Sequence, residues 1–292
     1  MPDRIVDKAP AKVNLTLRVQ ARRADGYHEL ESLVVFADRG DRLTFTPGET
    51  LGLTLSGVTA AQAGNDADNL VLKAARALAA RTPSMALGTF HLEKNLPVAA
   101  GLGGGSSDAA AALRLLAQAS GLKPDNPHCY EAARATGADV PVCLNPRPRL
   151  MRGIGERLSE ALTLPPLPAV LVNPGVALAT KAVFAGWKPG AQTPVPFDLA
   201  AVAKLESRDQ LLQILQGQPN DLEASAIVLQ PVIADVLAAL HGFGGCQLAR
   251  MSGSGATCFG LFSSAAEAET AAKILRAKNP GWWVQACTLG SG

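Results

Sequence analysis

The stretch that most constrains the fold of this chain runs from Pro97 to Ser107 and reads PVAAGLGGGSS. An apolar, strand-like run precedes it at 87–92, and an alanine-rich helical run follows it at 109–119. This order favours a glycine loop whose backbone N–H groups converge at a helix start, where the helix dipole adds positive charge. Such a loop suits a polyphosphate, and Ser106 or Ser107 would cap the helix or reach a phosphate or a metal ion. The alternative is a glycine-rich turn without a ligand, which loses conformational entropy on folding and adds no packing.

The familiar glycine fingerprints do not describe this loop. No lysine follows Gly105, as a GxxxxGK[ST] loop requires, and Ser106 stands where a GxGxxG motif counted from Gly101 needs its last glycine. The sequence also contains neither the HRD nor the DFG motif of protein kinases. The chain therefore carries a phosphate loop of another type. Its predicted nucleotide-binding residues are Pro97, Val98, Ala99, Ala100, Gly101, Leu102, Gly103, Gly104, Gly105, Ser106 and Ser107.

Length and charge narrow the class of protein. With 292 residues the chain is long enough for two domains, each with its own core. Strand-like and helical patterns occur in both halves, and prolines accumulate between them, so we expect α+β domains at 1–160 and 161–292. A formal net charge of +2 without a lysine or arginine run argues against nucleic acid as a partner. No apolar stretch approaches the ~20 residues that span a bilayer, so no membrane partner is expected either.

The cysteines and histidines do not form a metal-binding pattern. Five cysteines are scattered, never spaced as CxxC, and the four histidines do not complement them at ligand spacing. We therefore predict reduced, buried thiols, no metal site built from protein ligands, and a place in the bacterial cytoplasm.

Three short motifs outside the loop contain candidate functional residues. Lys12 and Asn14 lie two residues apart on a predicted strand and hence on one face, although Lys12 could be a solvated strand edge. Asp139 follows a helical run and precedes a proline that favours extended backbone, and its alternative is a cap or turn residue. SGSGA at 252–256 joins two predicted strands, either as a hairpin with a bulge or as a set of N–H groups that binds an anion.

The order of these motifs resembles that of the GHMP small-molecule kinases. APAKVNL, RADGYHEL, DNLVLKAA, LPVAAGLGGGSSDAA, GADVPV, NPGVALATKAVF and SGSGATCF follow one another as in that family, so the resemblance covers essentially the whole chain. The match is closest to members that phosphorylate a cytidine diphosphate-linked methylerythritol on its 2-hydroxyl, a step of isoprenoid precursor synthesis. The resemblance implies a two-domain α+β fold. Its N-terminal domain would be ribosomal protein S5 domain 2-like and its C-terminal domain ferredoxin-like, with the active site in the cleft between them.

The resemblance also implies catalytic and nucleotide-binding roles. Asp139 would accept a proton from the substrate hydroxyl, and Lys12 would orient that carboxylate through its charge. ATP would bind the glycine loop with Asn69 near the adenine, and Mg²⁺ would be held by the phosphates and a loop serine.

The same resemblance implies the residues that bind the second substrate. Tyr27, His28 and Phe184 would hold the pyrimidine, and stacking on a base contributes about 1–3 kcal/mol per ring. The alternatives are core packing for Phe184 and a satisfied loop histidine for His28. The other expected substrate contacts are Asn14, Thr180, Gly253, Ser254 and Gly255.

Two other functions remain open at this point. One is a related kinase acting on mevalonate or a sugar, whose substrate has no pyrimidine to stack. The other is a nucleotide-binding sensor without activity, which the presence of both Lys12 and Asp139 argues against. One stretch, 144–152, departs from the family pattern before GIGE at 153–156 and puts the local strand conformation in doubt. The resemblance is compatible with a monomer or a weak homodimer.

Overall fold

The computed structural model describes residues 4–63, 69–83, 85–123, 125–188, 197–205 and 207–290. The chain forms two compact units, each assembled from separate segments. Unit 1 comprises Met1–Lys12, Gly40–Val98 and Gly103–Pro146, and unit 2 comprises Val13–Arg39, Ala99–Leu102 and Arg147–Gly292. The domain boundary near residue 160 stays a prediction. In the described part of the chain, no helix is both long and apolar enough to cross a membrane.

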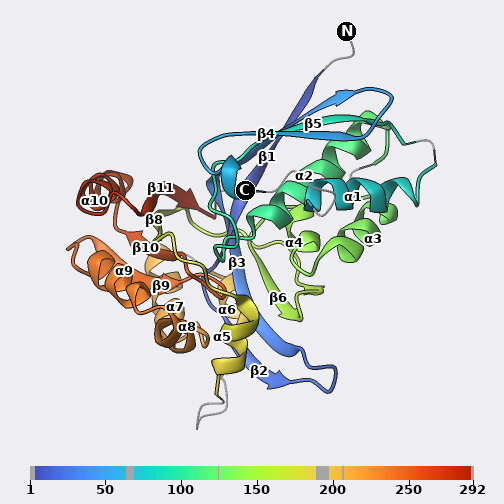
Figure 1. Cartoon of the computed structure of the whole chain (residues 1–292). Helices are drawn as coiled ribbons and strands as arrows, with labels where there is room; N and C mark the ends of the chain where they lie inside the picture. Colours follow the sequence, from blue (N-terminus) through green and yellow to red (C-terminus); the bar gives the residue numbers. More distant parts are fainter. Residues whose placement is uncertain are drawn as a thin grey trace. The chain divides into compact units, whose positions relative to one another are not determined.

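Unit 1 combines strands with a group of four helices that pack against one another (Figure 1). The second half of β3 pairs antiparallel with β5, and β5 pairs parallel with β4. The alternation of buried and exposed residues in β5 places Phe90 and Leu92 in the core, as expected for a half-buried strand. The elements are β1 (Ile5–Asn14), β3 (His28–Pro47), β4 (Gly52–Ser56), α1 (Leu70–Ala79), β5 (Gly88–Glu93), α2 (Gly104–Ala119), α3 (Pro127–Thr136) and α4 (Val140–Leu144), with a 3₁₀ turn at Ala60–Gln62.

Helix α2 begins earlier than the alanine pattern predicts. Its first residue is Gly104, and its N-cap is Gly103, which has no side chain to cap with. Gly103 adopts φ +59°, a left-handed conformation that lets the chain turn from the loop directly into the helix. Ser106 and Ser107 consequently lie inside the first turn, so the prediction that one of them is the N-cap is wrong.

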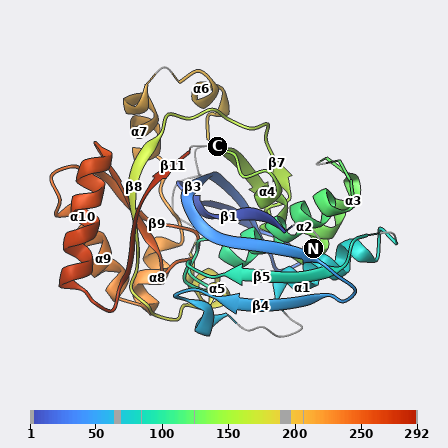
Figure 2. The same ribbon diagram turned by 90° about the horizontal axis from the view of Figure 1, so that it is seen from above.

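The core of unit 2 is an antiparallel sheet in the order β11-β8-β10-β9. Helices α9 and α10 lie side by side on one face of it (Figures 1 and 2), and their apolar residues pack with those of the strands. The first half of β3 pairs with β2 and with β6. The elements are β2 (Arg18–Arg22), β6 (Arg149–Gly153), β7 (Arg157–Leu158), β8 (Leu167–Asn173), α5 (Thr180–Gly186), α6 (Leu199–Ala203), α7 (Arg208–Gln216), α8 (Glu223–Leu229), α9 (Val232–His241), β9 (Cys246–Met251), β10 (Cys258–Phe262), α10 (Ala265–Lys278) and β11 (Trp283–Leu289).

The cysteines behave as the sequence predicts. All five are free thiols, and four of them are buried. Burial raises the pKa of the Cys143 thiol to about 12, although a hydrogen bond from Ser107 opposes this shift. Such thiols are protonated at neutral pH and are inert core side chains.

Candidate active site

Lys12 and Asp139 form an ion pair within unit 1. Lys12 lies on β1 and Asp139 lies directly before α4, and the Nζ–Oδ2 distance is 2.9 Å. The lysine side chain is only 5 % exposed, whereas that of the aspartate is 36 % exposed. Lys12 is therefore not a solvated strand edge, and Asp139 does not cap α4 with its side chain. The arrangement is a carboxylate held by a buried cation and open to a ligand on its other side.

The N-terminus of α2 lies beside this pair. A Cβ atom at Gly103 would lie 3.0 Å from Cε and 3.2 Å from Cβ of Lys12, so any side chain at this position would displace the lysine. The first N–H groups of a helix have no acceptor inside the helix and are available to an anion. Unit 1 thus brings together a helix N-terminus, a buried cation and a carboxylate.

The two serines of the loop have different surroundings. The Ser107 side chain is buried, and its hydroxyl donates to the carbonyl of Pro10 at 2.7 Å, which ties α2 to β1. The half-buried Ser106 makes no side-chain hydrogen bond within the described residues. Ser106 is therefore the loop serine that fits a ligand.

In unit 2 the SGSG motif binds the middle of the glycine loop. The Ser252 hydroxyl donates to the carbonyl of Gly101 at 3.0 Å and accepts from the backbone N–H of Asn14 at 3.1 Å. The N–H of Thr257 donates to the carbonyl of Ala100 at 3.1 Å. The motif is therefore more than a hairpin between β9 and β10, because it fixes residues 99–102 as a turn of defined shape.

Two of the three predicted pyrimidine residues, His28 and Phe184, lie in a cluster of rings in unit 2. His28, at the start of β3, stacks on Phe184 of α5 with ring centroids 4.9 Å apart and an interplanar angle of 27°. Trp187 meets the same imidazole edge-on at 5.7 Å, and Tyr27 is 60 % exposed. Burial and the charge of Arg22 lower the pKa of His28, which keeps its imidazole neutral at neutral pH. Phe184 also packs on the core of unit 2, as the core interpretation expects, and its contact with a pyrimidine stays a prediction.

Trp187 was not predicted from the sequence. A signal was available, because Trp187 is three residues after Phe184, and residues three apart on a helix lie on one face. Trp187 is the first residue after α5 and has extended backbone, and its N–H donates to the carbonyl of Phe184.

The remaining predicted residues make hydrogen bonds within their own units. In unit 2 the hydroxyls of Thr180 and Ser254 lie 2.9 Å apart, and Asn14 Nδ2 donates to Ser32 Oγ at 2.7 Å. In unit 1 Asn69 is the N-cap of α1, and its Oδ1 accepts from the N–H of Val71 at 3.0 Å. The assignment of Asn69 to the adenine side stays a prediction.

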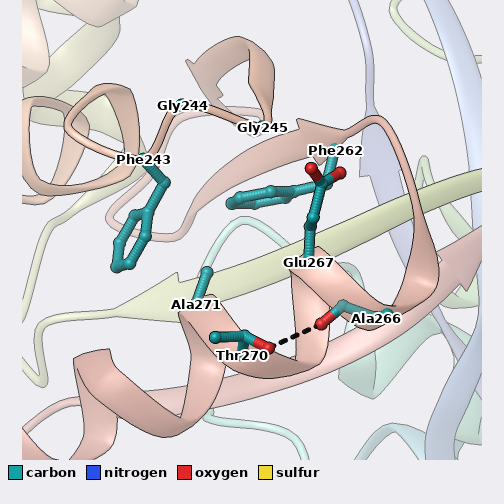
Figure 3. Close-up of a pocket in the computed structure, with 8 residues that line it drawn as sticks. All are labelled: Phe243, Gly244, Gly245, Phe262, Ala266, Glu267, Thr270 and Ala271. Atoms are coloured by element: carbon teal, nitrogen blue, oxygen red, sulfur yellow. Dashed lines mark hydrogen bonds between the residues drawn. The ribbon is translucent and has the colours of Figure 1, made fainter.

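A separate pocket of about 260 Å³ lies in unit 2, and none of the predicted site residues lines it (Figure 3). The rings of Phe243 and Phe262 form much of its wall. Its carboxylate, that of Glu267, accepts a hydrogen bond from Ser264 at the start of α10, and Thr270 Oγ1 donates to the carbonyl of Ala266. These hydrogen bonds lie at the start of α10 and within it. The residues that line the pocket do not include a base paired with a nucleophile or a cation.

Comparisons with known proteins agree with this geometry. The family model of the GHMP kinases N terminal domain matches residues 69–146, and that of the GHMP kinases C terminal domain matches residues 198–281. A 4-diphosphocytidyl-2-C-methyl-D-erythritol kinase of Methylobacterium radiotolerans is 58% identical over 286 residues, which cover 96% of this chain and 97% of that protein. A protein of the same name from Rhodopseudomonas palustris is 56% identical over 289 residues, covering 97% of this chain and 96% of its own.

Solved structures point to the same family. A crystal structure of 4-(cytidine 5'-diphospho)-2C-methyl-D-erythritol kinase matches with a TM-score of 0.79 at 37% identity and covers 99% of this chain and 100% of its own. L. major mevalonate kinase, at 17% identity and a TM-score of 0.66, covers 100% of this chain and 98% of its own and shares the fold. The chain therefore belongs to the GHMP kinases. It is a kinase with the two-part α+β fold of that family, and ATP is its phosphoryl donor.

Proposed function

We propose that this protein transfers the γ-phosphoryl group of ATP to the 2-hydroxyl of 4-diphosphocytidyl-2-C-methyl-D-erythritol, a step of the non-mevalonate route to isoprenoid precursors. The observation that carries this proposal is the Lys12–Asp139 pair beside the glycine-containing start of α2. Relatives more than half identical over nearly the whole chain have the name of that kinase, which supports the choice of acceptor.

Asp139 acts as the general base in this proposal. Its Oδ2 atom accepts from Lys12, and the partial exposure of its side chain leaves the carboxylate accessible to the acceptor hydroxyl. Lys12 is the positioning partner, because its ammonium group is buried and holds the carboxylate in one orientation. Phosphoryl transfer needs mainly positioning and charge stabilisation, which the N–H groups at the start of α2 also supply.

Mg²⁺ fits this site as an ion bound mainly through the nucleotide. Within the described ranges no three His, Cys, Asp or Glu side chains form a metal-binding group. Mg²⁺ usually keeps several waters and takes few ligands from the protein besides substrate phosphates. The hydroxyl of Ser106 is the loop oxygen that would join them, since that of Ser107 is bonded to Pro10. When bound, the ion neutralises phosphate charge.

The ring cluster supports a pyrimidine-containing acceptor. His28 and Phe184 already stack on each other, so a base would extend this stack, and Trp187 limits the movement of the imidazole. Tyr27 leaves most of its ring exposed in a chain in which aromatic residues make up only 4%. Mevalonate and sugars have no pyrimidine that would stack on these surfaces. We include Asn14, Thr180 and the backbone of 253–255 as polar contacts to the same acceptor.

An ADP-release assay with a panel of hydroxyl acceptors tests the proposal. The panel contains the cytidine diphosphate-linked methylerythritol, the same methylerythritol phosphate without cytidine, mevalonate, homoserine and galactose. We expect turnover with the first compound only, and inhibition by CDP that is competitive with the acceptor and not with ATP. Turnover of mevalonate or galactose at a comparable rate would assign the chain to another branch of the family. CDP competing only with ATP would remove the pyrimidine site.

The proposal also covers the location, oligomeric state and domain division of the protein. We infer a cytoplasmic enzyme, a monomer or weak homodimer, that has no nucleic acid partner and is divided near residue 160. The gap between the two family-model matches, 146 to 198, supports that division. Light scattering of the purified chain at several concentrations tests the oligomeric state, and limited proteolysis tests the boundary.

A further inference from the structure

Three charged side chains are buried together behind the glycine loop in unit 1. Lys94 Nζ donates to Asp41 Oδ2 and, at 2.8 Å, to Asp108 Oδ2. None of the three side chains is more than 4 % exposed. They come from three places in the chain: Asp41 from β3, Lys94 from the residue after β5, and Asp108 from α2. We call this group the Asp41–Lys94–Asp108 cluster.

The cluster holds the segment that enters the glycine loop. Oδ1 of Asp41 accepts from the backbone N–H groups of Asn95 at 2.6 Å and Leu96 at 2.8 Å. The carbonyl of Leu96 accepts from the hydroxyl of Thr59 at 2.8 Å. Leu96 directly precedes the first loop residue, and its N–H and C=O are both bonded to buried side chains. The entry of the loop is thereby fixed in position.

The same cluster holds the helix that leaves the loop. Asp108 lies on the first turns of α2, and its bond to Lys94 links the helix to the entry segment. Lys94 also lies under the first helical residue, because a Cβ atom at Gly104 would be 3.1 Å from Nζ. One ammonium group therefore connects both ends of the loop.

Burial of such a cluster needs a reason other than stability. Removing ionisable groups from water is costly, and replacing buried ion pairs by apolar side chains is often neutral or stabilising. Within the described residues Oδ1 of Asp108 has no hydrogen-bond partner, whereas its Oδ2, both oxygens of Asp41 and the ammonium group of Lys94 are bonded. Such bonds specify one geometry, because each group has few alternative partners in an apolar interior. The geometry specified here is the spacing between the entry of the loop and the start of α2.

We propose that Asp41, Lys94 and Asp108 are positioning residues that fix both ends of the glycine loop in the shape that binds the nucleotide phosphates. None of the three has to touch the substrate for this role. The inference rests on the proposed use of the loop for ATP, and it deepens that proposal by naming what pre-organises the loop.

Binding measurements on the full chain test this role. Dissociation constants for AMP-PNP with Mg²⁺ and for CDP are measured by calorimetry for the wild type, Asp41→Asn, Lys94→Met and the control Glu131→Gln. Glu131 makes an ion pair with Arg81 on the exterior of unit 1, so the control removes an exposed carboxylate by the same chemical change. We expect Asp41→Asn and Lys94→Met to weaken AMP-PNP binding by about 10- to 100-fold, as loss of positioning typically does. CDP binding and the control variant should change by less than about twofold.

The outcomes separate this inference from the proposed function. A wild type that binds neither ligand refutes the proposed function itself. A wild type that binds both, with folded Asp41→Asn and Lys94→Met variants of unchanged AMP-PNP affinity, overturns the positioning role. Thermal unfolding of each variant identifies those that do not fold.

Hydrogen exchange on the ligand-free wild type keeps the inference testable if neither variant folds. The amides of Asn95 and Leu96 should exchange at least 100-fold more slowly than the amide of Val98, because both are bonded to Asp41 in the buried cluster, whereas that of Val98 donates only a long, exposed bond of 3.5 Å to Gln62 Oε1. Equal exchange rates in the absence of nucleotide would show that the cluster does not fix the loop entry.

Discussion

The close approach of Gly103 to Lys12 allows a test with a matched control on the same helix. Gly103 precedes α2 and Gly121 follows it, and their φ angles are +59° and +66°. Alanine in this left-handed region costs about 1–2 kcal/mol at either position. A Cβ at position 103 meets Lys12 at 3.0 Å, whereas a Cβ at 121 meets nothing within 4 Å. The backbone strain is therefore common to both variants, and the contact with Lys12 is not.

The magnitude of the catalytic effect follows from that contact. Carbon atoms in favourable contact are about 3.5–4.0 Å apart, so Lys12 must move by roughly 0.5–1 Å to admit the methyl group. The displacement disturbs the 2.9 Å bond to Asp139. Since a misplacement of about 1 Å can cost 10²-fold in rate, we expect Gly103→Ala to lower kcat by about 10- to 100-fold.

Steady-state ADP release and urea unfolding measure the two effects separately. Both variants should lose about 1–2 kcal/mol in the free energy of unfolding, and Gly121→Ala should keep kcat within about twofold of the wild type. If Gly103→Ala is as active as Gly121→Ala at equal stability, the position of Lys12 does not control the rate, and the catalytic assignment of the pair loses its support.

Three further predictions address other parts of the site. Asp139→Asn should lower kcat by about 10²–10⁴-fold, because an amide cannot accept the proton, and should change the dissociation constant of ATP little. A kcat within a few-fold of the wild type would remove Asp139 from the role of base. Phe184→Ala should raise KM for the cytidine-containing acceptor by about 5- to 150-fold and leave KM for ATP unchanged, and equal changes in the two constants would argue against a separate pyrimidine site. Burial and the charge of Asp41 raise the pKa of Asp108 from 3.8 to about 8, although Lys94 opposes the shift. The folded protein therefore binds the proton of the Asp108 carboxyl group more tightly than the unfolded chain does. The contribution of Asp108 to the free energy of unfolding therefore falls as the pH rises from about 4 to 8. Urea unfolding should show that the free energy of unfolding of Asp108→Asn falls less over this pH range than that of the wild type. Identical pH profiles of the two proteins would contradict the pKa shift.

Local patterns in the sequence predicted most elements of the fold. The strand before the glycine loop and the helix after it are present as β5 and α2, because alternation and alanine content report local preferences directly. The start of α2 at Gly104 was missed, since it depends on the left-handed backbone of Gly103. The apolar pattern over 222–240 predicts one helix, but the structure has two, α8 and α9, which are separated around Pro231 because its ring is incompatible with a helix interior.

Long-range pairs could not be predicted from spacing. Lys12 and Asp139 are 127 residues apart, and the sequence connected them only through the resemblance to a family. The Asp41–Lys94–Asp108 cluster was missed for a different reason. In a sequence, isolated charged residues resemble a solvated surface, and nothing local indicates that a fold will bury a lysine with two carboxylates.

The unequal exposure of Lys12 and Asp139 supports the roles that we propose for them, without reference to any relative. A buried ammonium group on a strand has few rotamers and cannot move far toward a substrate, whereas a carboxylate that is 36 % exposed can meet a hydroxyl from the solvent side. A general base must come within hydrogen-bond reach of the proton that it accepts, and a positioning group needs only to be fixed. The more accessible member of the pair is therefore the one that we propose as the base. An inactive nucleotide sensor would have no use for an oriented carboxylate at this position. Loss of turnover in Asp139→Asn with intact ATP binding would therefore also distinguish a kinase from a sensor.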